Sequence, residues 1–183
     1  PYQLNRISFN VVPENMDISS VFADIDLLLV SDDSGSYYVP GFGIDQIGDV
    51  DVLEGYSVFP SGADAQTITV EGLPAELGPV MLSPYLSNAV PYLPQECMSV
   101  FDAFAGNEDR ILVVQNDAGG FYVPSFGVAT LTEMCPGYGY SVFLSGADGF
   151  DFTYPESGGN ARTSAMLAWE SYCLLYTSDA ADE

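Results

Sequence analysis

An internal duplication constrains the fold of this chain more than any other feature. The phrase YSVFPSGAD at residues 56–64 returns as YSVFLSGAD at residues 140–148, at an offset of 84 residues. At this offset, 18 of the 37 positions in residues 28–64 are identical to their partners. Self-similarity at a fixed period is the signature of a repeated structural unit, so we expect two units of one fold. The expected division is a first β-repeat at residues 1–74, a linker at 75–78, a second β-repeat at 79–155, a tail at 156–172 and a final segment at 173–183.

In each unit, short runs of β-forming residues alternate with turn residues. LLLV at residues 27–30 leads through SDDSGS to SYYVP, and ILVV at residues 111–114 leads through QNDAGG to GFYVP. A strand, an Asp/Gly turn and a second strand predict a β-hairpin. Asp17 and Ser99 each precede apolar residues at helical spacing, so we expect one short helix per unit. The pattern predicts a mainly β fold of two tandem homologous lobes, each sandwich-like or barrel-like.

The charge balance excludes two classes of partner. The 183-residue chain carries 26 acidic residues against three arginines, without lysine or histidine, for a formal charge of −23. Nucleic acids and anionic membrane surfaces are bound by clustered Lys and Arg, so we expect neither partner. No apolar run approaches the ~20 residues of a membrane span, so we expect no membrane insertion. Such a charge fits a protein that faces salty or calcium-containing water, where dissolved ions screen the repulsion between its acidic residues. We therefore expect an extracellular or cell-surface location.

The same composition limits enzymatic chemistry. Without histidine, Ser-His-Asp and Cys-His arrangements are impossible, and without lysine there is no Schiff-base chemistry. A glycosidase needs only two carboxylates, but the acidic residues that are identical in both units are Asp33 with Asp117 and Asp64 with Asp148. These positions are ones where β-turns favour Asp. We therefore expect a protein that is not an enzyme.

Calcium is the metal that the acidic residues are best suited to attract. Asp45, Asp49, Asp51 and Glu54 fall within ten residues, but the second unit keeps an acidic residue at only one of the four equivalent positions. The spacing also differs from that of an EF-hand. We expect a solvated acidic loop that binds Ca²⁺ weakly at most, and no other cofactor.

The last segment of the chain stands apart from the rest. Residues 173–183 read CLLYTSDAADE, which resembles, residue for residue, one reading frame of an adapter used in preparing sequencing libraries. We expect these residues to be foreign to the native protein, which leaves Cys97 and Cys135 as its cysteines. Extracellular proteins with two cysteines often pair them, but a bridge also needs Cα atoms within roughly 7 Å. Cys97 and Cys135 are thus the candidate disulfide, with paired and free thiols both left open by their spacing.

The aromatic residues divide into repeated and unrepeated ones. The repeated ones suit the core of each unit, because a duplicated fold keeps its core. They are Tyr38 with Tyr122, Phe42 with Phe126, Tyr56 with Tyr140, and Phe59 with Phe143. The unrepeated Tyr85, Tyr92 and Trp169 are candidates for a ligand or interface surface, such as a platform on which sugar rings stack. Glycans thus stay open as a ligand or, since no Asn-x-Ser/Thr sequon occurs, as an O-linked attachment.

The order of apolar strand, Asp/Gly turn, aromatic-x-Pro-x-aromatic-Gly and G-Y-x-V resembles a known repeat. It is similar to a tandem β-repeat of secreted and surface proteins of Bacteroidota-like environmental bacteria. The matching positions are Asp33, Gly35, Tyr38, Pro40, Phe42, Gly43, Gly55 and Tyr56, and then Asp117, Gly119, Tyr122, Pro124, Phe126, Gly127, Gly139 and Tyr140. Such repeats usually open with a Gly-Trp-Asn-like phrase, which this chain lacks in both units. The resemblance implies a surface or structural module without a catalytic role.

A difference between the units bears on assembly. PVMLS at residues 79–83 predicts a strand that opens the second unit. The given chain starts at Pro1, so it contains no equivalent opening strand for the first unit. An unpaired strand edge is a template for another chain. We expect the tail at 161–172, or a neighbouring subunit, to complete the first unit by β-augmentation. The alternative is an opening strand upstream of Pro1 in a longer natural chain. The candidate interface residues are Trp169, Tyr172, Met166 and Tyr2.

A contact from the end of one molecule to the beginning of the next is heterologous and propagates as a fibre unless it closes into a ring. We therefore expect a homo-oligomeric, self-assembling structural protein, a protomer of an extracellular filament or surface assembly. The alternative from a different class is an adhesin or carbohydrate-binding module of a larger secreted protein.

Overall fold

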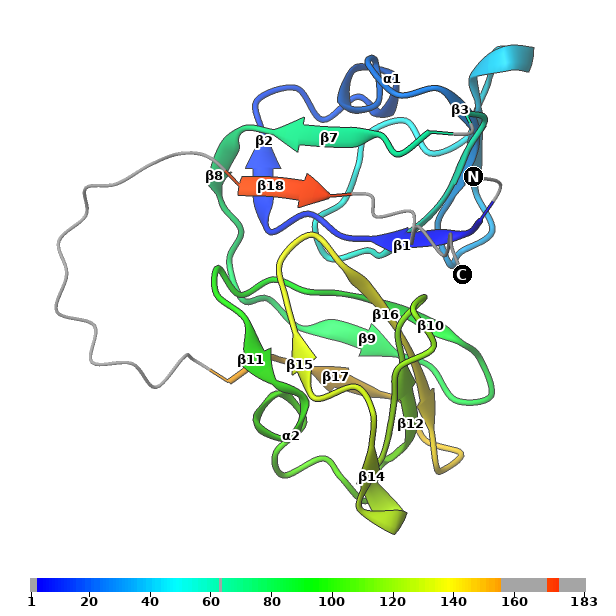
Figure 1. Ribbon diagram of the computed structural model, residues 1–183. Helices are drawn as coiled ribbons and strands as arrows, with labels where there is room; N and C mark the ends of the chain where they lie inside the picture. Colours follow the sequence, from blue (N-terminus) through cyan, green and yellow to red (C-terminus); the bar gives the residue numbers. More distant parts are fainter. Residues whose placement is uncertain (1–2, 63, 156–170, 175–183) are drawn as a thin grey trace, which may run out of the picture.

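The structure, a computed structural model, describes residues 3–62 and 64–155 in full and residues 171–174 by their backbone. The fold is mainly β and is built from antiparallel sheets (Figure 1), which confirms the predicted mainly β class. Among the described residues the sheets stay open, so the sandwich-like alternative describes the chain better than the barrel-like one. Tyr2, Met166 and Trp169 lie outside the described residues, and only the backbone of Tyr172 is described.

Two five-stranded sheets have the same strand order. The first runs β1 (Asn5–Ile7), β6 (Tyr56–Pro60), β3 (Leu27–Ser31), β4 (Tyr37–Val39) and β5 (Ile44–Asp45). The second runs β10 (Asn88–Pro91), β16 (Gly139–Leu144), β12 (Ile111–Gln115), β13 (Phe121–Val123) and β14 (Val128–Ala129). The registers also agree at the 84-residue offset, because Val30 lies opposite Tyr38 and Val58 as Val114 lies opposite Tyr122 and Val142.

Shorter pairs and helices complete the fold. The two-stranded pairs are β2 (Val11–Pro13) with β8 (Gly72–Pro74), β11 (Met98–Ser99) with β15 (Glu133–Met134), β9 (Val80–Leu82) with β17 (Phe150–Phe152), and β7 (Thr67–Val70) with β18 (Ser171–Leu174). The helices are α1 (Ile18–Val21), α2 (Val100–Ala103) and the 3₁₀ turns η1 (Pro40–Phe42) and η2 (Pro124–Phe126). Asp17 and Ser99 cap α1 and α2 as predicted: Asp17 accepts the backbone N–H groups of Ser19 and Ser20, and Ser99 accepts that of Phe101. No helix in the described part of the chain has the length and apolar character that crossing a membrane requires.

The predicted hairpins turn through the same chemistry in both units. The side chain of Asp32 accepts the backbone N–H of Ser36 at 2.8 Å, and the side chain of Asn116 accepts that of Gly120 at 2.7 Å. The turn glycines Gly35 and Gly119 have φ angles of 93° and 83°, a region that costs glycine little.

Buried apolar side chains form two clusters, one drawn from residues 7–70 and the other from residues 75–154. Tyr56 and Tyr140 lie in these cores, as predicted for repeated aromatics. The same prediction is wrong for Phe42 and Phe126, which are 83% and 80% exposed. Each sits in a 3₁₀ turn that projects past the sheet, and repetition alone cannot tell a kept core residue from a kept surface residue. The prediction is also wrong for Phe59 and Phe143, which lie between buried residues of β6 and β16 and are only partly buried.

Tyr92 also differs from its predicted role as a surface residue. It is fully buried, packs edge-on against Tyr140 and Tyr154, and donates its hydroxyl hydrogen to the backbone oxygen of Glu96 at 2.6 Å. Its aromatic neighbours come from β16 and from the segment after β17, which are distant in the sequence, so a linear sequence does not reveal the contact. Tyr85, in contrast, is 82% exposed, in agreement with its predicted surface position.

Candidate functional site

The strand β7 has a partner from a distant part of the chain. Its counterpart in the second unit, β17, pairs antiparallel with β9, the strand that leads directly into β10. At the equivalent place, β7 pairs antiparallel with β18, so that Ile68 lies opposite Cys173 and Thr69 opposite Tyr172. Figure 1 shows β18 alongside β7 in the first unit. One edge thus receives a strand from its own unit and the other from the far end of the chain.

The strand β18, which pairs with β7, contains residues from two segments of the chain. Ser171 and Tyr172 belong to the predicted donor tail, whereas Cys173 and Leu174 belong to the segment that resembles an adapter translation. Strand addition relies on main-chain hydrogen bonds, which any residue except proline can supply. The receptive element is therefore the edge of β7 itself.

A surface pocket lies at the end of this edge where β18 begins. It has a volume of about 760 Å³ and is formed by β2, α1, β7 and β8. Val12, Val21 and Leu73 supply apolar lining, and Val70 both lines the pocket and lies opposite Ser171. Glu14 and Glu71 add carboxylates to a lining that is otherwise uncharged. An incoming strand at β7 therefore has a recess beside it that offers both apolar and acidic side chains.

The two units contact each other reciprocally through their repeated aspartates. The carboxylate of Asp33 accepts the backbone N–H of Ala89 at 2.9 Å. The carboxylate of Asp117 accepts the backbone N–H of Arg6, and the Arg6 guanidinium also donates to it at 2.8 Å. Arg6 lies opposite Ser57 as Ala89 lies opposite Ser141, so the two contacts are equivalent. Such an exchange of like contacts is the arrangement of an isologous dimer, here within one chain.

This finding corrects the predicted role of Asp33 and Asp117. Asp32 and Asn116 carry the turn hydrogen bonds, and the next residue in each turn reaches the other unit. The signal was present in the sequence, because these aspartates are among the few acidic residues identical in both units. Only the relative placement of the units shows what they bind.

Two repeated glycines allow this close approach. A Cβ on Gly55 would lie 2.5 Å from the backbone oxygen of Ala89, and a Cβ on Gly139 would lie 3.0 Å from that of Ile7. Gly55 also donates its N–H to Ala89 at 3.1 Å. The G-Y-x-V motif therefore begins with glycine because the backbone of the other unit occupies the space of a side chain.

The four predicted calcium residues are not brought together as a ligand set. Asp45 accepts the backbone N–H groups of Ile47 and Gly48, and Asp51 accepts that of Leu53, so both serve local turns. Among the described residues, the one group with potential ligand atoms in mutual reach is Cys97, Glu133 and Cys135. Its two sulfur atoms are joined to each other in a disulfide at the end of the β11–β15 pair.

Glu54 lies instead in the contact between the units. A cavity of about 210 Å³ there is lined by Asp33, Glu54, Ala89 and residues of β9. Burial raises the pKa of Glu54 to about 8, helped by its hydrogen bond with Asp33 and by the charges of Asp33, Asp32 and Asp51. The β9 and β10 residues that line this cavity bring no charge to it.

The equivalent contact has the opposite electrostatics. At the 84-residue offset Tyr138 stands in place of Glu54, and Arg6 stands where the first contact has Ala89. One contact is therefore a carboxylate paired with a guanidinium. The other brings two carboxyl groups together, and Glu54 keeps its proton up to a pKa of about 8.

A comparison of the chain with protein-family models, with curated proteins and with solved structures finds no match.

Proposed function

We propose that this protein is a non-enzymatic extracellular structural protein, a protomer of a filament or surface assembly built by strand-edge contacts. The observation that carries the proposal is the pairing of β18 with β7. A strand from the end of the chain completes an edge in the first unit, where the second unit uses its own β9.

A contact that closes within one chain can also close between two chains. When two protomers exchange an identical strand, the strand makes the same contacts as it does within one chain. The free-energy cost of the exchange is therefore little more than that of ordering the segment that connects the strand to its own protomer. If β18 of one protomer pairs with β7 of the next, the contact is heterologous and continues from subunit to subunit. The reciprocal contact between the units supports the proposal further, because it couples the donor and acceptor ends of each protomer through a fixed interface.

Negative-stain microscopy and sedimentation of the full chain test this proposal. We expect polymers from the full chain and their loss when residues 156–183 are removed. In a strand, neighbouring residues direct their N–H groups to opposite sides, so either Tyr172 or Cys173 donates toward β7. A second variant, Tyr172→Pro with Cys173→Pro, keeps the full length and removes that donor in either case. The matched control carries Ser178→Pro and Asp179→Pro, outside β18, and should polymerise. A monomeric full chain, or polymers that survive the proline pair in β18, would contradict the proposal.

A second candidate is an adhesin or carbohydrate-binding module. It is favoured by the exposed aromatics Tyr85, Phe42 and Phe126, because aromatic rings are common sugar-stacking surfaces. Tyr85 has a φ of 62°, and a strained position of this kind is enriched at binding sites. Under this alternative, a glycan screen with the full chain gives a ligand whose binding Tyr85→Ala weakens, while the chain stays monomeric.

A further inference from the structure

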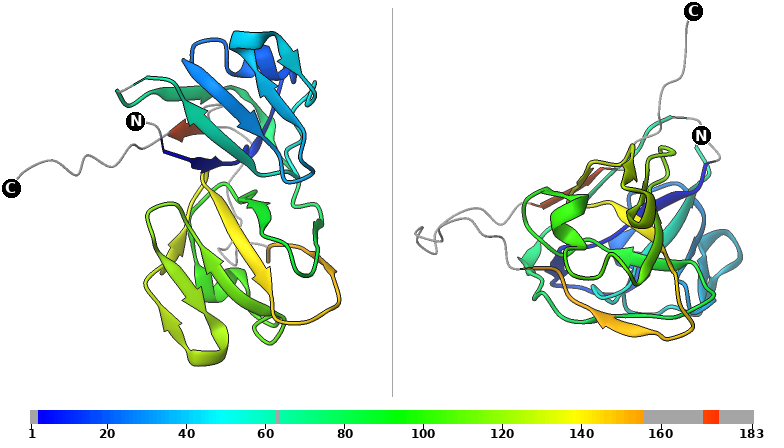
Figure 2. Two further views of the ribbon diagram at one scale, coloured as in Figure 1. Left: turned by 90° about the vertical axis from the view of Figure 1, so that its right-hand side faces the viewer. Right: turned by 90° about the horizontal axis from the view of Figure 1, so that it is seen from below.

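The pocket at the end of the β7 edge lies where the incoming strand begins. Its wall includes Thr69 and Val70 of β7, and Ser171, the first residue of β18, lies opposite Val70. Figure 1 and Figure 2 (left) agree in showing β18, drawn in red, beside β7 in the first unit. The chain that enters β18 at Ser171 therefore meets β7 at the pocket.

The direction of β18 relates its beginning to the rest of the pocket wall. The pairing is antiparallel, so β18 begins at the end of the pair from which β7 continues into Glu71, Gly72 and Leu73, which all line the pocket. Trp169 precedes Ser171 by two residues, and two residues of extended chain span at most about 7 Å. The covalent connection alone therefore keeps Trp169 next to this wall.

The chemistry of the pocket suits an indole ring. Glu14 and Glu71 supply carboxylate oxygens that accept hydrogen bonds. The apolar part of the wall comes from valine, proline and leucine side chains, namely Val12, Pro13, Val21, Val70 and Leu73. A tryptophan side chain combines a large apolar ring with one N–H donor, which usually finds an acceptor when the ring is buried.

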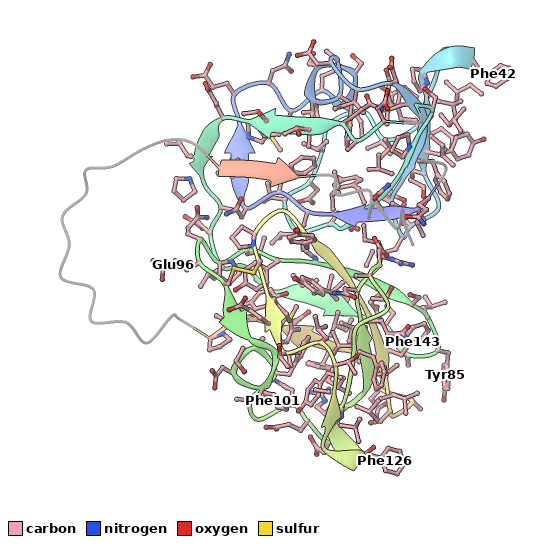
Figure 3. The ribbon with its side chains drawn as sticks, in the orientation of Figure 1. Phe42, Tyr85, Glu96, Phe101, Phe126 and Phe143 are labelled. Carbon is pink, nitrogen blue, oxygen red and sulfur yellow. A yellow bond between two sulfur atoms is a disulfide. The ribbon has the colours of Figure 1, made fainter. Side chains whose placement is uncertain are left out.

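The pocket wall contains no aromatic side chain from the described residues. The exposed aromatic residues labelled in Figure 3 lie on other parts of the surface, and they are Phe42, Tyr85, Phe101 and Phe126. Leu73, in contrast, belongs to the wall and is 61% exposed. The wall thus offers apolar surface that the described residues leave uncovered.

Charge favours the tail as the occupant of this pocket. Among the described residues the one ion pair lies in the contact between the units, so Glu14 and Glu71 have no cationic partner there. Arg162, one of the three arginines of the chain, belongs to the tail and precedes Ser171 by nine residues. Nine residues of extended chain span up to about 30 Å, so the tail that enters β18 can bring a guanidinium to these carboxylates.

We propose that this pocket binds residues 161–170 of the tail that enters β18, with the indole ring of Trp169 as the anchor. Side chains alternate along a strand, so Trp169 falls on the face of Ser171 and Val70, and Glu170 falls on the other face. Tryptophan is enriched among the residues that carry most of the binding energy of an interface. Main-chain hydrogen bonds at β7 accept almost any strand, and the pocket selects the strand that brings Trp169. The proposal rests on the β7–β18 pairing of the proposed function, and it names the side chain that this edge recognises.

The fluorescence of the full chain tests the proposal directly, because Trp169 is its only tryptophan. We expect emission at shorter wavelength, and slower quenching by acrylamide, than for free N-acetyltryptophanamide, because the indole ring is removed from water. Leu73→Glu places a carboxylate in the apolar wall, and should shift the emission to longer wavelength and speed the quenching. The matched control, Leu112→Glu, makes the same change at a 50% exposed strand position of the second unit, and should leave both properties as in the wild type.

Polymers of the full chain give a second readout. Trp169→Ala removes the anchor and leaves the sequence of β18 intact, so we expect the critical concentration for polymers to rise at least about tenfold. Trp169→Phe keeps an aromatic ring and should raise it less. An unchanged critical concentration in Trp169→Ala would overturn the pocket proposal.

The pocket and the filament fail in different ways. Polymers whose indole is quenched as fast as the free compound would overturn the pocket proposal and leave the proposed function standing. A monomeric chain in which Leu73→Glu, but not Leu112→Glu, exposes the indole would support the pocket and contradict the filament. Equal effects of the two variants, or none, would overturn the pocket proposal as well. Unchanged circular dichroism and thermal melting of Leu73→Glu exclude a lost fold, and if this variant unfolds, Val21→Glu on the α1 wall of the pocket repeats the test.

Discussion

The carboxylate of Asp33 accepts a hydrogen bond from the backbone N–H of Ala89, 56 residues further along the chain and in the other unit. The equivalent bond joins Asp117 to Arg6 in the reverse direction. A duplicated sequence has thereby produced an interface with approximate two-fold symmetry inside one chain, and the two halves of that interface have since diverged in charge.

Removal of the two aspartates should have unequal effects. Asp117→Ala loses the backbone bond and the ion pair with Arg6, whereas Asp33→Ala loses the bond from Ala89 and the hydrogen bond with Glu54 but no ion pair. We expect Asp117→Ala to lower the free energy of unfolding by about 1–2 kcal/mol and Asp33→Ala to lower it by less. Urea unfolding measures both, with exposed Asp24→Ala as the control. Equal losses would contradict the assignment of the ion pair to the second contact alone.

The pH dependence of stability should reveal Glu54. Burial beside Asp33 raises the pKa of Glu54 from its usual 4.5 to about 8 in the folded protein. Between these two values the folded protein holds a proton that the unfolded chain has released, so the contribution of this group to stability falls as the pH rises from 4.5 to 8. Glu54→Gln resembles the protonated side chain, and should flatten the decline in melting temperature over that window.

The control for this prediction is Glu14→Gln, at an exposed position outside the contact between the units, which should keep the decline of the wild type. The assignment to Glu54 fails if wild type and Glu54→Gln lose melting temperature in parallel between pH 4.5 and 8. Asp33→Asn should also reduce the decline, because it keeps a hydrogen-bond acceptor for Ala89 and removes the nearest negative charge.

The sequence predicted the local elements well because their causes are local. The hairpin around Asp32 follows from a turn that one side chain and one glycine specify, and the helix at Asp17 follows from a single cap. Tyr56 was placed in the core correctly, because it combines repetition with a strand position that alternates toward the buried side. These inferences need only the residues within a few positions of the element.

The predictions that failed concern long-range placement. Phe42 repeats as faithfully as Tyr56 but is exposed, since the 3₁₀ turn that carries it lies beyond the sheet. The sequence indicates only a turn role for Asp33, because its partner Ala89 is distant in the sequence. Asp33 binds the backbone N–H of Ala89, and a backbone group leaves no signal in the pattern of side chains. The pairing of β18 with β7 agrees with the expected donation of a strand by the tail, but its register and its extension to Cys173 and Leu174 could not be foreseen.

The disulfide should stabilise the second unit selectively. Cys97 and Cys135 close a loop with a sequence separation of 38 residues, and a cross-link of this size contributes about 2–4 kcal/mol. The backbone N–H of Cys135 also donates to the hydroxyl of Tyr140 in the second core at 2.8 Å. In the variant Cys97→Ser with Cys135→Ser, we expect faster hydrogen exchange in β11, β15 and β16 and little change in β3, β4 and β6. Uniformly faster exchange over both units would show instead that they unfold as one.

The glycines of the G-Y-x-V motif provide the sharpest test of the contact between the units. An added methyl group at Gly55 would meet the backbone oxygen of Ala89 at 2.5 Å, a distance that real Cβ atoms do not tolerate, so the strands must separate. At Gly139 the nearest backbone atom is 3.0 Å away, so a shift of a few tenths of an ångström relieves the clash. We therefore expect both substitutions by alanine to destabilise the protein by about 1–3 kcal/mol, with Gly55→Ala the more severe. Gly41→Ala is the matched control, because nothing lies within 4 Å of a Cβ at that position and it should change the free energy of unfolding by less than about 0.5 kcal/mol. If Gly55→Ala proves as harmless as Gly41→Ala in urea unfolding, β10 does not lie against the start of β6, and the reciprocal interface between the units is placed wrongly.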